Sequence, residues 1–298
     1  MDKRSFREFK RRAPVVNGIF YPDSSEALTE KLASWALKDG SARAVKGGSR
    51  RNAAEGAQAI LVPHGAWDLT GNIAGTAFAA VQEEEEKTDL FIDRVLLLGP
   101  RHNSAEDGIY LSESAFFETP SGDLPVDQEL NQQLASCSPL IKVYDIPHLS
   151  EHSLEVLLPL VKYCFPAAKI VPILMAGTDP VLISGLAKAL QRVFEKHLGK
   201  TLIVISSSVS HDHDPALALS MADEFRGLLA DMDTGIFLAQ LAAGRVSACG
   251  GALVGALLAS DLFKGKYFSA LGPLAQATGE NGETIYYGAF ACAPHGAE

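Results

Sequence analysis

Four residues that can bind a metal ion or transfer a proton lie where short apolar runs of this chain end. They are His64, His102, His211 and Cys249. Each histidine follows a run rich in aliphatic residues, and the cysteine stands just before a Gly-Gly pair that opens an apolar helical pattern. Ligands of α/β folds bind beyond the carboxyl ends of the strands. We therefore interpret these side chains as parts of one site at that edge of a sheet.

Short β-branched runs that alternate with helical patterns predict a sheet covered on both faces. The expected strands are 59–63, 94–99, 169–175, 202–206 and 284–292. The expected helices are 24–39, one from Gly71 into the acidic run 83–86, a short one from Asp127, 151–163, 179–197, 214–229, 233–243 and 250–262. Ser24 or Ser25 is expected to cap the first helix, and Asp214 with Pro215 is expected to open another.

Two further segments carry polar side chains that are suited to chemistry. In the segment 148–155, His148 and His152 are spaced to share one face of a helix. Their order differs from the H-E-x-x-H of zinc proteases, and Glu151 and Glu155 would also suit a helix N-terminus electrostatically. The serine-rich loop before His211 lacks the G-x-S-x-G pattern of a nucleophilic serine.

Ordinary structural roles remain open for these residues. His64 and His102, each taken alone, also fit turn histidines that bond to their neighbours. Cys249 also fits a small buried residue, although a helix N-terminus would favour its thiolate. The remaining cysteines and two other histidines have no supporting context, and we assign no role to them: Cys137, Cys164, Cys292, His197 and His295.

Composition limits the class of protein. The chain has 298 residues, of which 47% are hydrophobic, so it can bury a large core. A net charge of −10 argues against a general nucleic-acid surface. Four widely spaced cysteines indicate reduced thiols and a cytoplasmic location, and we expect neither a secretory signal nor a membrane span. We predict a basic tail at 1–12 and one domain at 13–298, with a mobile loop at 40–57.

Seven ordered motifs, which together cover most of the chain, resemble those of the MEMO family. They are G-x-F-Y-P at 18–22, the P-H segment at 63–67, L-G-P-x-H at 98–102, the Thr119, Pro120 and Asp127 pattern, E-H-S-x-E-x-x-L-P at 151–159, the serine–histidine segment at 206–211, and the Cys249-Gly250 pair. The resemblance implies a fold similar to class III extradiol (LigB-like) non-haem iron dioxygenases. That fold is a single αβα sandwich, also described as LigB/phosphorylase-like, with a central mixed or mostly parallel sheet.

The resemblance also implies roles for individual residues. The family places two histidines and a cysteine around iron or copper, and the matching residues here are His64, His102 and Cys249. Two imidazoles and one anionic ligand leave coordination positions open for oxygen or substrate. Proton transfer then falls to His211 and His152, and the surrounding shell includes Ser208, Asp212 and Glu151.

Two departures from the family pattern touch this site. The family aspartate falls on Ser208, so an anionic group near the ion is missing unless Asp212 compensates for it. The segment 63–67 exchanges the order of alanine and glycine and carries Trp67 where the family has tyrosine. These changes leave open whether this chain has an altered metal affinity or keeps the fold without the chemistry.

The leading hypothesis is a MEMO-like protein with a mononuclear metal site and an oxygenase-like or other metal-dependent redox activity. The alternative is a non-catalytic adaptor that uses the same pocket for an anionic or short peptide ligand. A third possibility is a hydrolase with Cys249 or Ser208 as the nucleophile. We expect a small-molecule or peptide partner and neither nucleic acid nor membrane. The sequence does not give the substrate or the oligomeric state.

Overall fold

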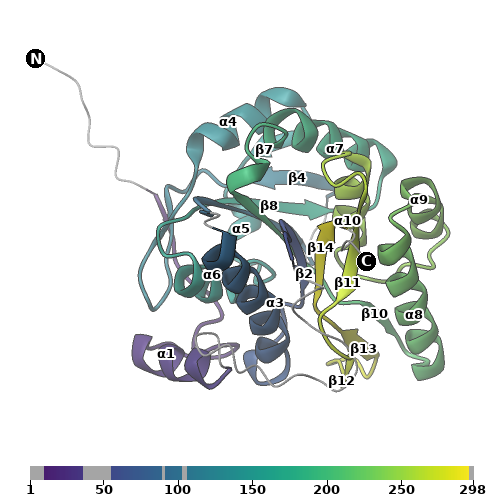
Figure 1. Ribbon diagram of the computed structural model, residues 1–298, viewed down its shortest axis with the longest axis horizontal. Coiled ribbons are helices and arrows are strands. Elements are labelled where there is room, and N and C mark those ends of the chain that lie inside the picture. Colours follow the sequence, from purple (N-terminus) through teal and green to yellow (C-terminus); the bar gives the residue numbers. More distant parts are fainter. Residues whose placement is uncertain (1–9, 36–54, 89–90, 103–105, 295–298) are drawn as a thin grey trace, which may run out of the picture.

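A mixed eight-stranded sheet forms the centre of the molecule (Figure 1). The computed structural model describes residues 10–35, 55–88, 91–102 and 106–294. In spatial order, the strands of the sheet are β11 (Lys266–Ala270), β14 (Phe290–Pro294), β2 (Ala59–Val62), β9 (Thr201–Ser206), β3 (Arg94–Pro100), β8 (Lys169–Ala176), β4 (Gly108–Leu111) and β7 (Ile141–Val143). The four strands β2, β9, β3 and β8 are parallel, while β14 and β4 flank them in the antiparallel direction. The expected α/β class with a mixed sheet is therefore confirmed.

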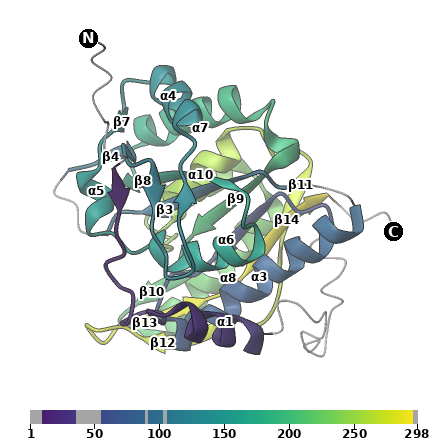
Figure 2. The same cartoon turned by 90° about the vertical axis from the view of Figure 1, so that its left-hand side faces the viewer.

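Helices cover both faces of this sheet (Figures 1 and 2). One face packs against α1 (Ser25–Ser34), α3 (Trp67–Thr88) and α6 (Leu158–Cys164). The other face packs against α4 (Gln128–Cys137), α7 (Pro180–Phe194), α8 (Pro215–Asp231), α9 (Thr234–Ala242) and α10 (Gly251–Ala259). Short helical segments are α5 (Ile146–Leu149), η1 (Glu155–Leu157) and η2 (Leu198–Lys200). No helix within the described ranges is both long and apolar enough to cross a bilayer.

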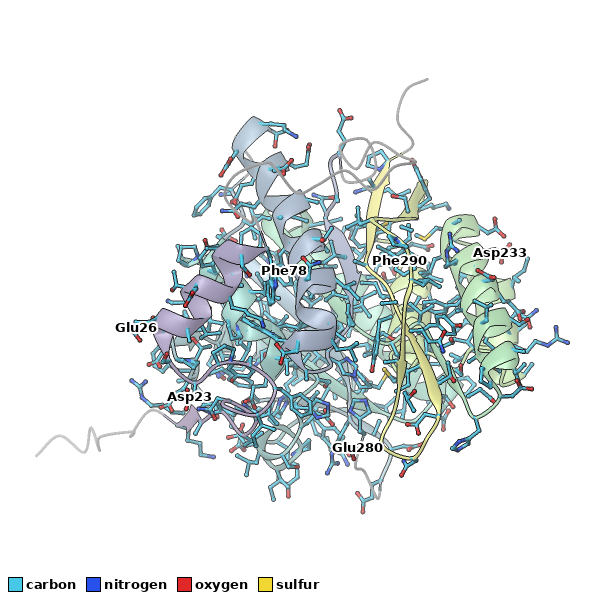
Figure 3. The ribbon with its side chains drawn as sticks, turned by 90° about the horizontal axis from the view of Figure 1, so that it is seen from below. Asp23, Glu26, Phe78, Asp233, Glu280 and Phe290 are labelled. Carbon is cyan, nitrogen blue, oxygen red and sulfur yellow. The ribbon has the colours of Figure 1, made fainter. Side chains whose placement is uncertain are left out.

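The alternation of side chains along the strands explains the two core layers. Ile60 faces the layer with α3, whereas Leu61 faces the layer with α7 and α10. Figure 3 shows one large aromatic residue from each layer, Phe78 of α3 and Phe290 of β14, which are 0% and 2% exposed. Burial of such side chains on both faces supplies the main driving force for folding. It also fixes the strand ends from which the site residues extend.

Three helices have their N-caps at residues that were expected from the sequence. Ser24, Asp127 and Asp214 each accept a hydrogen bond from a backbone N–H of the first turn of α1, α4 and α8. The helix expected at 151–163 is divided into η1 and α6, and Pro159 lies in the first turn of α6, where the missing N–H of proline costs little. Within the acidic run 83–86, Glu84 is buried and pairs with Lys87.

Two small sheets contain strands whose limits or pairing were not expected from the sequence. Arg11–Arg12, expected within a basic tail, forms β1, which pairs with β5 (Phe116–Phe117), and β5 pairs in turn with β6 (Leu124–Pro125). The expected strand 284–292 is split into β13 (Thr284–Tyr287) and β14. Strand β13 pairs with β10 (Ser210–Asp212) and β12 (Ala275–Thr278). Of the loop expected at 40–57, only residues 55–57 lie inside the described ranges.

Candidate metal centre

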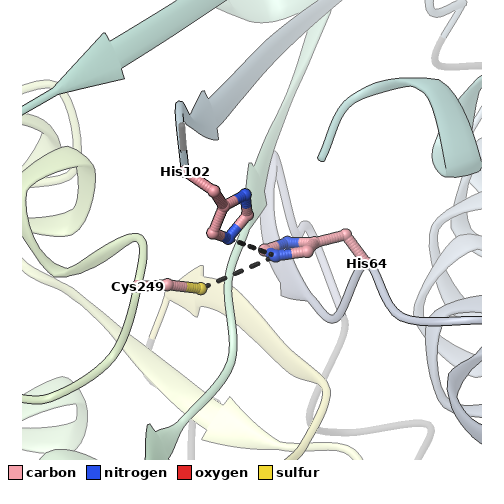
Figure 4. Close-up of side chains that lie close together, drawn as sticks. All are labelled: His64, His102 and Cys249. Atoms are coloured by element: carbon pink, nitrogen blue, oxygen red, sulfur yellow. Dashed lines mark hydrogen bonds between the residues drawn. The ribbon is translucent and has the colours of Figure 1, made fainter. Parts of the chain in front are cut away.

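Two histidines and a cysteine meet at one edge of the central sheet. His64 follows β2 and His102 follows β3, and both strands run parallel to β9, which lies between them. Cys249 lies in the turn just before α10. His64 Nε2 lies 3.3 Å from His102 Nε2 and 3.7 Å from Cys249 Sγ, and Figure 4 marks these two contacts with dashed lines. All three ligand atoms lie within 4.8 Å of one another, so the predicted convergence is present.

A serine at the end of β9 orients the ring of His64. Ser206 Oγ lies 2.7 Å from His64 Nδ1 and donates its own hydrogen to the carbonyl oxygen of Ser153, at 2.6 Å. Because that hydroxyl hydrogen is already used, the hydrogen between Ser206 and His64 must belong to Nδ1. His64 Nε2 therefore presents a lone pair toward His102 and Cys249.

A carboxylate orients the ring of His102 in the same way. Glu151 Oε1 lies 3.0 Å from His102 Nδ1, and Glu151 Oε2 accepts the backbone N–H of His102 at 2.7 Å. The backbone N–H groups of His152 and Ser153 also donate to Oε1. Burial alone would raise the pKa of Glu151, but its hydrogen bonds with His102 and Ser153 lower that pKa to about 2. An ionised carboxylate accepts the Nδ1 hydrogen, so Nε2 of His102 faces inward.

The spacing of the three inward-facing atoms fits a tetrahedral ion. Bonds of about 2.0–2.1 Å to nitrogen and about 2.3 Å to sulfur place two nitrogens about 3.3 Å apart, and nitrogen and sulfur about 3.6 Å apart. The distances in the structure are 3.3 Å from His64 to His102 and 3.7 Å from His64 to Cys249. Two of the three spacings therefore match those of ligands on one tetrahedral ion, and the third pair, His102 and Cys249, has its ligand atoms within 4.8 Å of each other.

The electrostatics of the cluster also favour a cation between these atoms. Burial opposes ionisation of Cys249, but the neighbouring His64 and His102 rings outweigh it and hold the pKa of the thiol well below its ordinary value. Burial likewise opposes the charge on His102, yet hydrogen bonds to Cys249 and Glu151 raise the pKa of that histidine. A shared proton thus balances the thiolate, and a metal ion would supply the same positive charge in its place.

His152 forms an aromatic wall beside the cluster. Its ring stacks on His102 with centroids 5.2 Å apart and meets Phe20 edge to face at 5.0 Å. Burial is the main reason that the pKa of His152 falls to about 4, so the ring is neutral near pH 7. His102, Glu151 and His152 form a second group of closely spaced ligand atoms. Its carboxylate, however, already accepts four N–H groups.

Ser208 contacts the sulfur of Cys249 directly. Its backbone N–H donates to Cys249 Sγ at 3.1 Å, and its hydroxyl lies 3.2 Å from the same sulfur. Gly250 permits this close approach, because a Cβ at that position would lie 2.7 Å from the side chain of Ser207 and 2.8 Å from the carbonyl oxygen of Ser206. The Cys-Gly pair and the serine segment are therefore fitted to each other.

Three other predicted site residues lie elsewhere. The side chain of His211 is exposed on β10, and its backbone N–H donates to Ser247. Asp212 accepts the backbone N–H of Asp214 rather than contacting the cluster. Neither belongs to a group of ligand atoms within 4.8 Å among the described residues. His148 and His152 do not share a helix, because α5 ends at Leu149 and His148 is buried with Nε2 on the carbonyl oxygen of Tyr110.

Two residues near the cluster were missed by sequence reasoning. Ser206 was noted only as part of a serine-rich loop, although its place as the last residue of a strand was a usable signal. Tyr287 is the last residue of β13, far along the chain, yet its hydroxyl lies near Gly65, 3.7 Å from where a Cβ of that glycine would be. Burial and the charge of Cys249 raise the pKa of Tyr287. No sequence motif around Tyr287 predicted that its side chain would lie near the cluster.

Comparisons with known proteins agree with these observations. A family model described as Memo-like protein matches residues 12–271. A MEMO1 family protein of Metallosphaera sedula is 27% identical over 285 residues, which cover 93% of this chain and 97% of that protein. MEMO1 family protein SSO0066 of Saccharolobus solfataricus is 30% identical over 216 residues, covering 72% of this chain and 74% of that protein.

Among solved structures, the chain is similar to an uncharacterized protein, JW3007, from Escherichia coli K12. The TM-score is 0.49 and the sequence identity is 12%. The similarity covers 78% of this chain and 98% of that chain.

Proposed function

This chain belongs to the Memo-like protein family, and we propose that it binds one transition-metal ion through His64, His102 and Cys249 and uses that ion in oxidation–reduction chemistry. Iron and copper are the ions we propose, because imidazole and thiolate suit both. When bound, such an ion supplies a one-electron couple and coordination positions for a small molecule.

One observation carries this proposal. Both outer nitrogens, His64 Nδ1 and His102 Nδ1, donate their hydrogens to Ser206 and Glu151. The two Nε2 atoms and the thiolate of Cys249 consequently face one another with one shared proton among them, in the place that a bound cation would take.

The remaining residues of the site would serve the ion and its ligand. Ser206 and Glu151 hold the two rings in place, which keeps the Nε2 atoms available. His152, neutral near pH 7 and stacked on His102, is better placed to accept a proton from a bound molecule than the exposed His211.

Anaerobic metal titration of the metal-free, reduced protein tests the proposal. We expect one iron(II) or copper(I) ion per chain by elemental analysis, together with a rise in melting temperature, since an ion that binds only the folded state stabilises it. His64→Ala and Cys249→Ser should each weaken binding more than about a hundredfold, because loss of an outer partner alone costs 10–100-fold. His213→Ala and Cys137→Ser, which lie outside the cluster, serve as matched controls.

The outcomes separate the alternatives. Unchanged binding in His64→Ala and Cys249→Ser would contradict the site, and absence of binding by the unmodified chain would contradict the function. Dioxygen uptake by the iron-loaded or copper-loaded protein with ascorbate as reductant is the expected redox signature. Tight binding of the ion without any such uptake would instead favour the non-catalytic adaptor, in which the same pocket holds an anionic or peptide ligand.

A further inference from the structure

We infer that Ser208 sets how strongly this site prefers the lower oxidation state of its metal, through the two hydrogen bonds that it gives to the sulfur of Cys249. The inference rests on the proposed metal binding and concerns a different property of the site. Ser208 touches the ligand sulfur rather than a substrate, so it is a positioning residue that acts through Cys249.

The geometry assigns the hydrogens around this sulfur. The backbone N–H of Cys249 donates to Ser208 Oγ at 3.2 Å, which occupies a lone pair of that hydroxyl. The hydroxyl hydrogen of Ser208 is then free to point at Cys249 Sγ, 3.2 Å away. The backbone N–H of Ser208 reaches the same sulfur at 3.1 Å. One residue therefore supplies two donors to the thiolate in a closed loop with Cys249.

The neighbouring serine does not share this role. Ser207 Oγ donates its hydrogen to the carbonyl oxygen of Ser208 at 2.6 Å and accepts the backbone N–H of Gly250 at 2.8 Å. Its 3.8 Å approach to Cys249 Sγ is therefore a contact without a hydrogen to give. Only 5% of Ser208 is exposed, so water competes little for the sulfur at that side.

Donors to a ligand sulfur draw electron density away from the metal. The ion then gains less from the thiolate in its higher oxidation state, so the reduced state is favoured and the reduction potential rises. The charge count has the same effect. Two neutral imidazoles and one thiolate bring a charge of −1, which a monovalent ion balances and a divalent ion exceeds. A hydroxyl at position 208 adds no further negative charge, unlike a carboxylate.

Copper is the probe for this inference, since its two states differ by one electron. Each bound copper(II) accepts one electron from ascorbate, and the ratio of the copper(II) to the copper(I) dissociation constant measures the preference. Ser208→Ala, which removes the O–H donor, should lower this ratio about tenfold, or about 59 mV for a one-electron couple. Ser208→Asp should lower it further, and Ser208→Thr, which restores the hydroxyl, should stay near the unmodified protein.

Ser210→Ala is the matched control, because Ser210 is a buried serine of the same segment whose hydroxyl donates to the carbonyl oxygen of Ala218 instead. It should leave the ratio unchanged. The sulfur-to-copper(II) charge-transfer band of Ser208→Ala should also move to longer wavelength, which a merely structural loss would not produce.

A failure of the inference differs from a failure of the proposed function. Copper that binds stoichiometrically to all variants with one common ratio and band position overturns the role of Ser208 alone. Absence of copper binding by the unmodified chain overturns the inference, and absence of iron binding as well overturns the proposed function. If Ser208→Ala does not fold, the lower ratio in Ser208→Asp and the preserved ratio in Ser208→Thr decide the question.

Discussion

Two polar clusters lie beside each other in this molecule and differ in how their inner groups are paired. The metal cluster, named for the proposed ion, consists of His64, His102 and Cys249, whose ligand atoms face one another; His64 is buried, Cys249 is partly buried and His102 is exposed. The anchor cluster consists of Arg12, Tyr21 and Glu155. Each oxygen of Glu155 faces donors: the Arg12 guanidinium, the Tyr21 hydroxyl at 3.0 Å, and the backbone N–H groups of residues 15 and 16. The segment 151–155 contributes a carboxylate to each cluster.

The difference shows how to distinguish a structural cluster from a candidate ligand site. Arg12 also donates to the carbonyl oxygens of His148 and Glu151, so the anchor cluster satisfies its own groups and ties β1 to the segment behind the metal cluster. Nothing further is needed for its stability. In the metal cluster, the outer nitrogens of the two rings are paired with Ser206 and Glu151, whereas the inner atoms face one another and share one proton, in the place that the proposed cation would take.

Breaking the anchor cluster should have the largest effect on stability. Arg12→Met leaves Glu155 buried without its cation, and removal of one partner of a buried pair costs about 3–5 kcal/mol. We expect this loss in urea unfolding of the metal-free protein. The exposed pair of Arg11 with Asp123 offers the matched control, Arg11→Met, with an expected cost below about 1 kcal/mol.

The copper affinity of the folded Arg12→Met protein should stay within a few fold of the unmodified value. A large loss of affinity with little loss of stability would reverse the distinction between the two clusters.

The histidine of the anchor region should make stability depend on pH. Burial is the main cause that lowers the pKa of His148 to about 4 from its ordinary 6.5. Above pH 6.5 the ring is neutral in the folded and unfolded chains alike. As the pH falls from 6.5 toward 4, the unfolded chain binds a proton that the folded chain refuses, so this contribution to stability, roughly 3 kcal/mol, is lost.

Urea unfolding of the metal-free protein between pH 7 and pH 4 measures this effect. His148→Gln, which keeps a donor for the carbonyl oxygen of Tyr110, should have a flatter profile over that interval. His213→Gln, at an exposed position, should keep the steep one. Parallel profiles for all three proteins would show that His148 is not kept neutral by the fold.

Much of the fold and the metal cluster followed from the sequence for a physical reason. The strands β2, β3 and β9 are aliphatic runs buried on both faces, so their limits were visible, and parallel strands bring their carboxyl ends together. Residues placed directly after such strands, such as His64 and His102, inherit a predictable position. Cys249 was predictable only through its Cys-Gly motif, because it follows no strand.

Other parts depend on contacts between distant segments, which local patterns do not encode. Arg12 reads as one more basic residue of a charged tail, and only its pairing with Glu155, 143 positions away, makes it a core residue. His211 carries the right chemistry in the right segment, but the direction of its side chain is set by the pairing of β10 with β13. The spacing of His148 and His152 suggested one helix, yet that helix ends between them.

The smallest expected effect is also the sharpest test of the comparison, because it uses the two carboxylates of one motif. Glu151→Gln keeps the size of the side chain but removes the charge that holds the His102 Nδ1 hydrogen. One of its two terminal atoms becomes a donor that faces N–H groups of the backbone. We expect copper(I) affinity to fall 10–100-fold, the usual consequence of losing an outer partner of a ligand histidine.

Glu155→Gln makes the same chemical change four residues later, where the partner is Arg12 rather than a ligand histidine. It should lower the free energy of unfolding while leaving the copper(I) affinity of the folded protein close to that of the unmodified chain. The free energy of unfolding and the copper(I) affinity are measured for both variants. If the two clusters have separate roles, the affinity should change mainly in Glu151→Gln. Equal losses of affinity in the two variants would mean that the clusters act as one network, in which the anchor cluster also determines the geometry of the metal ligands.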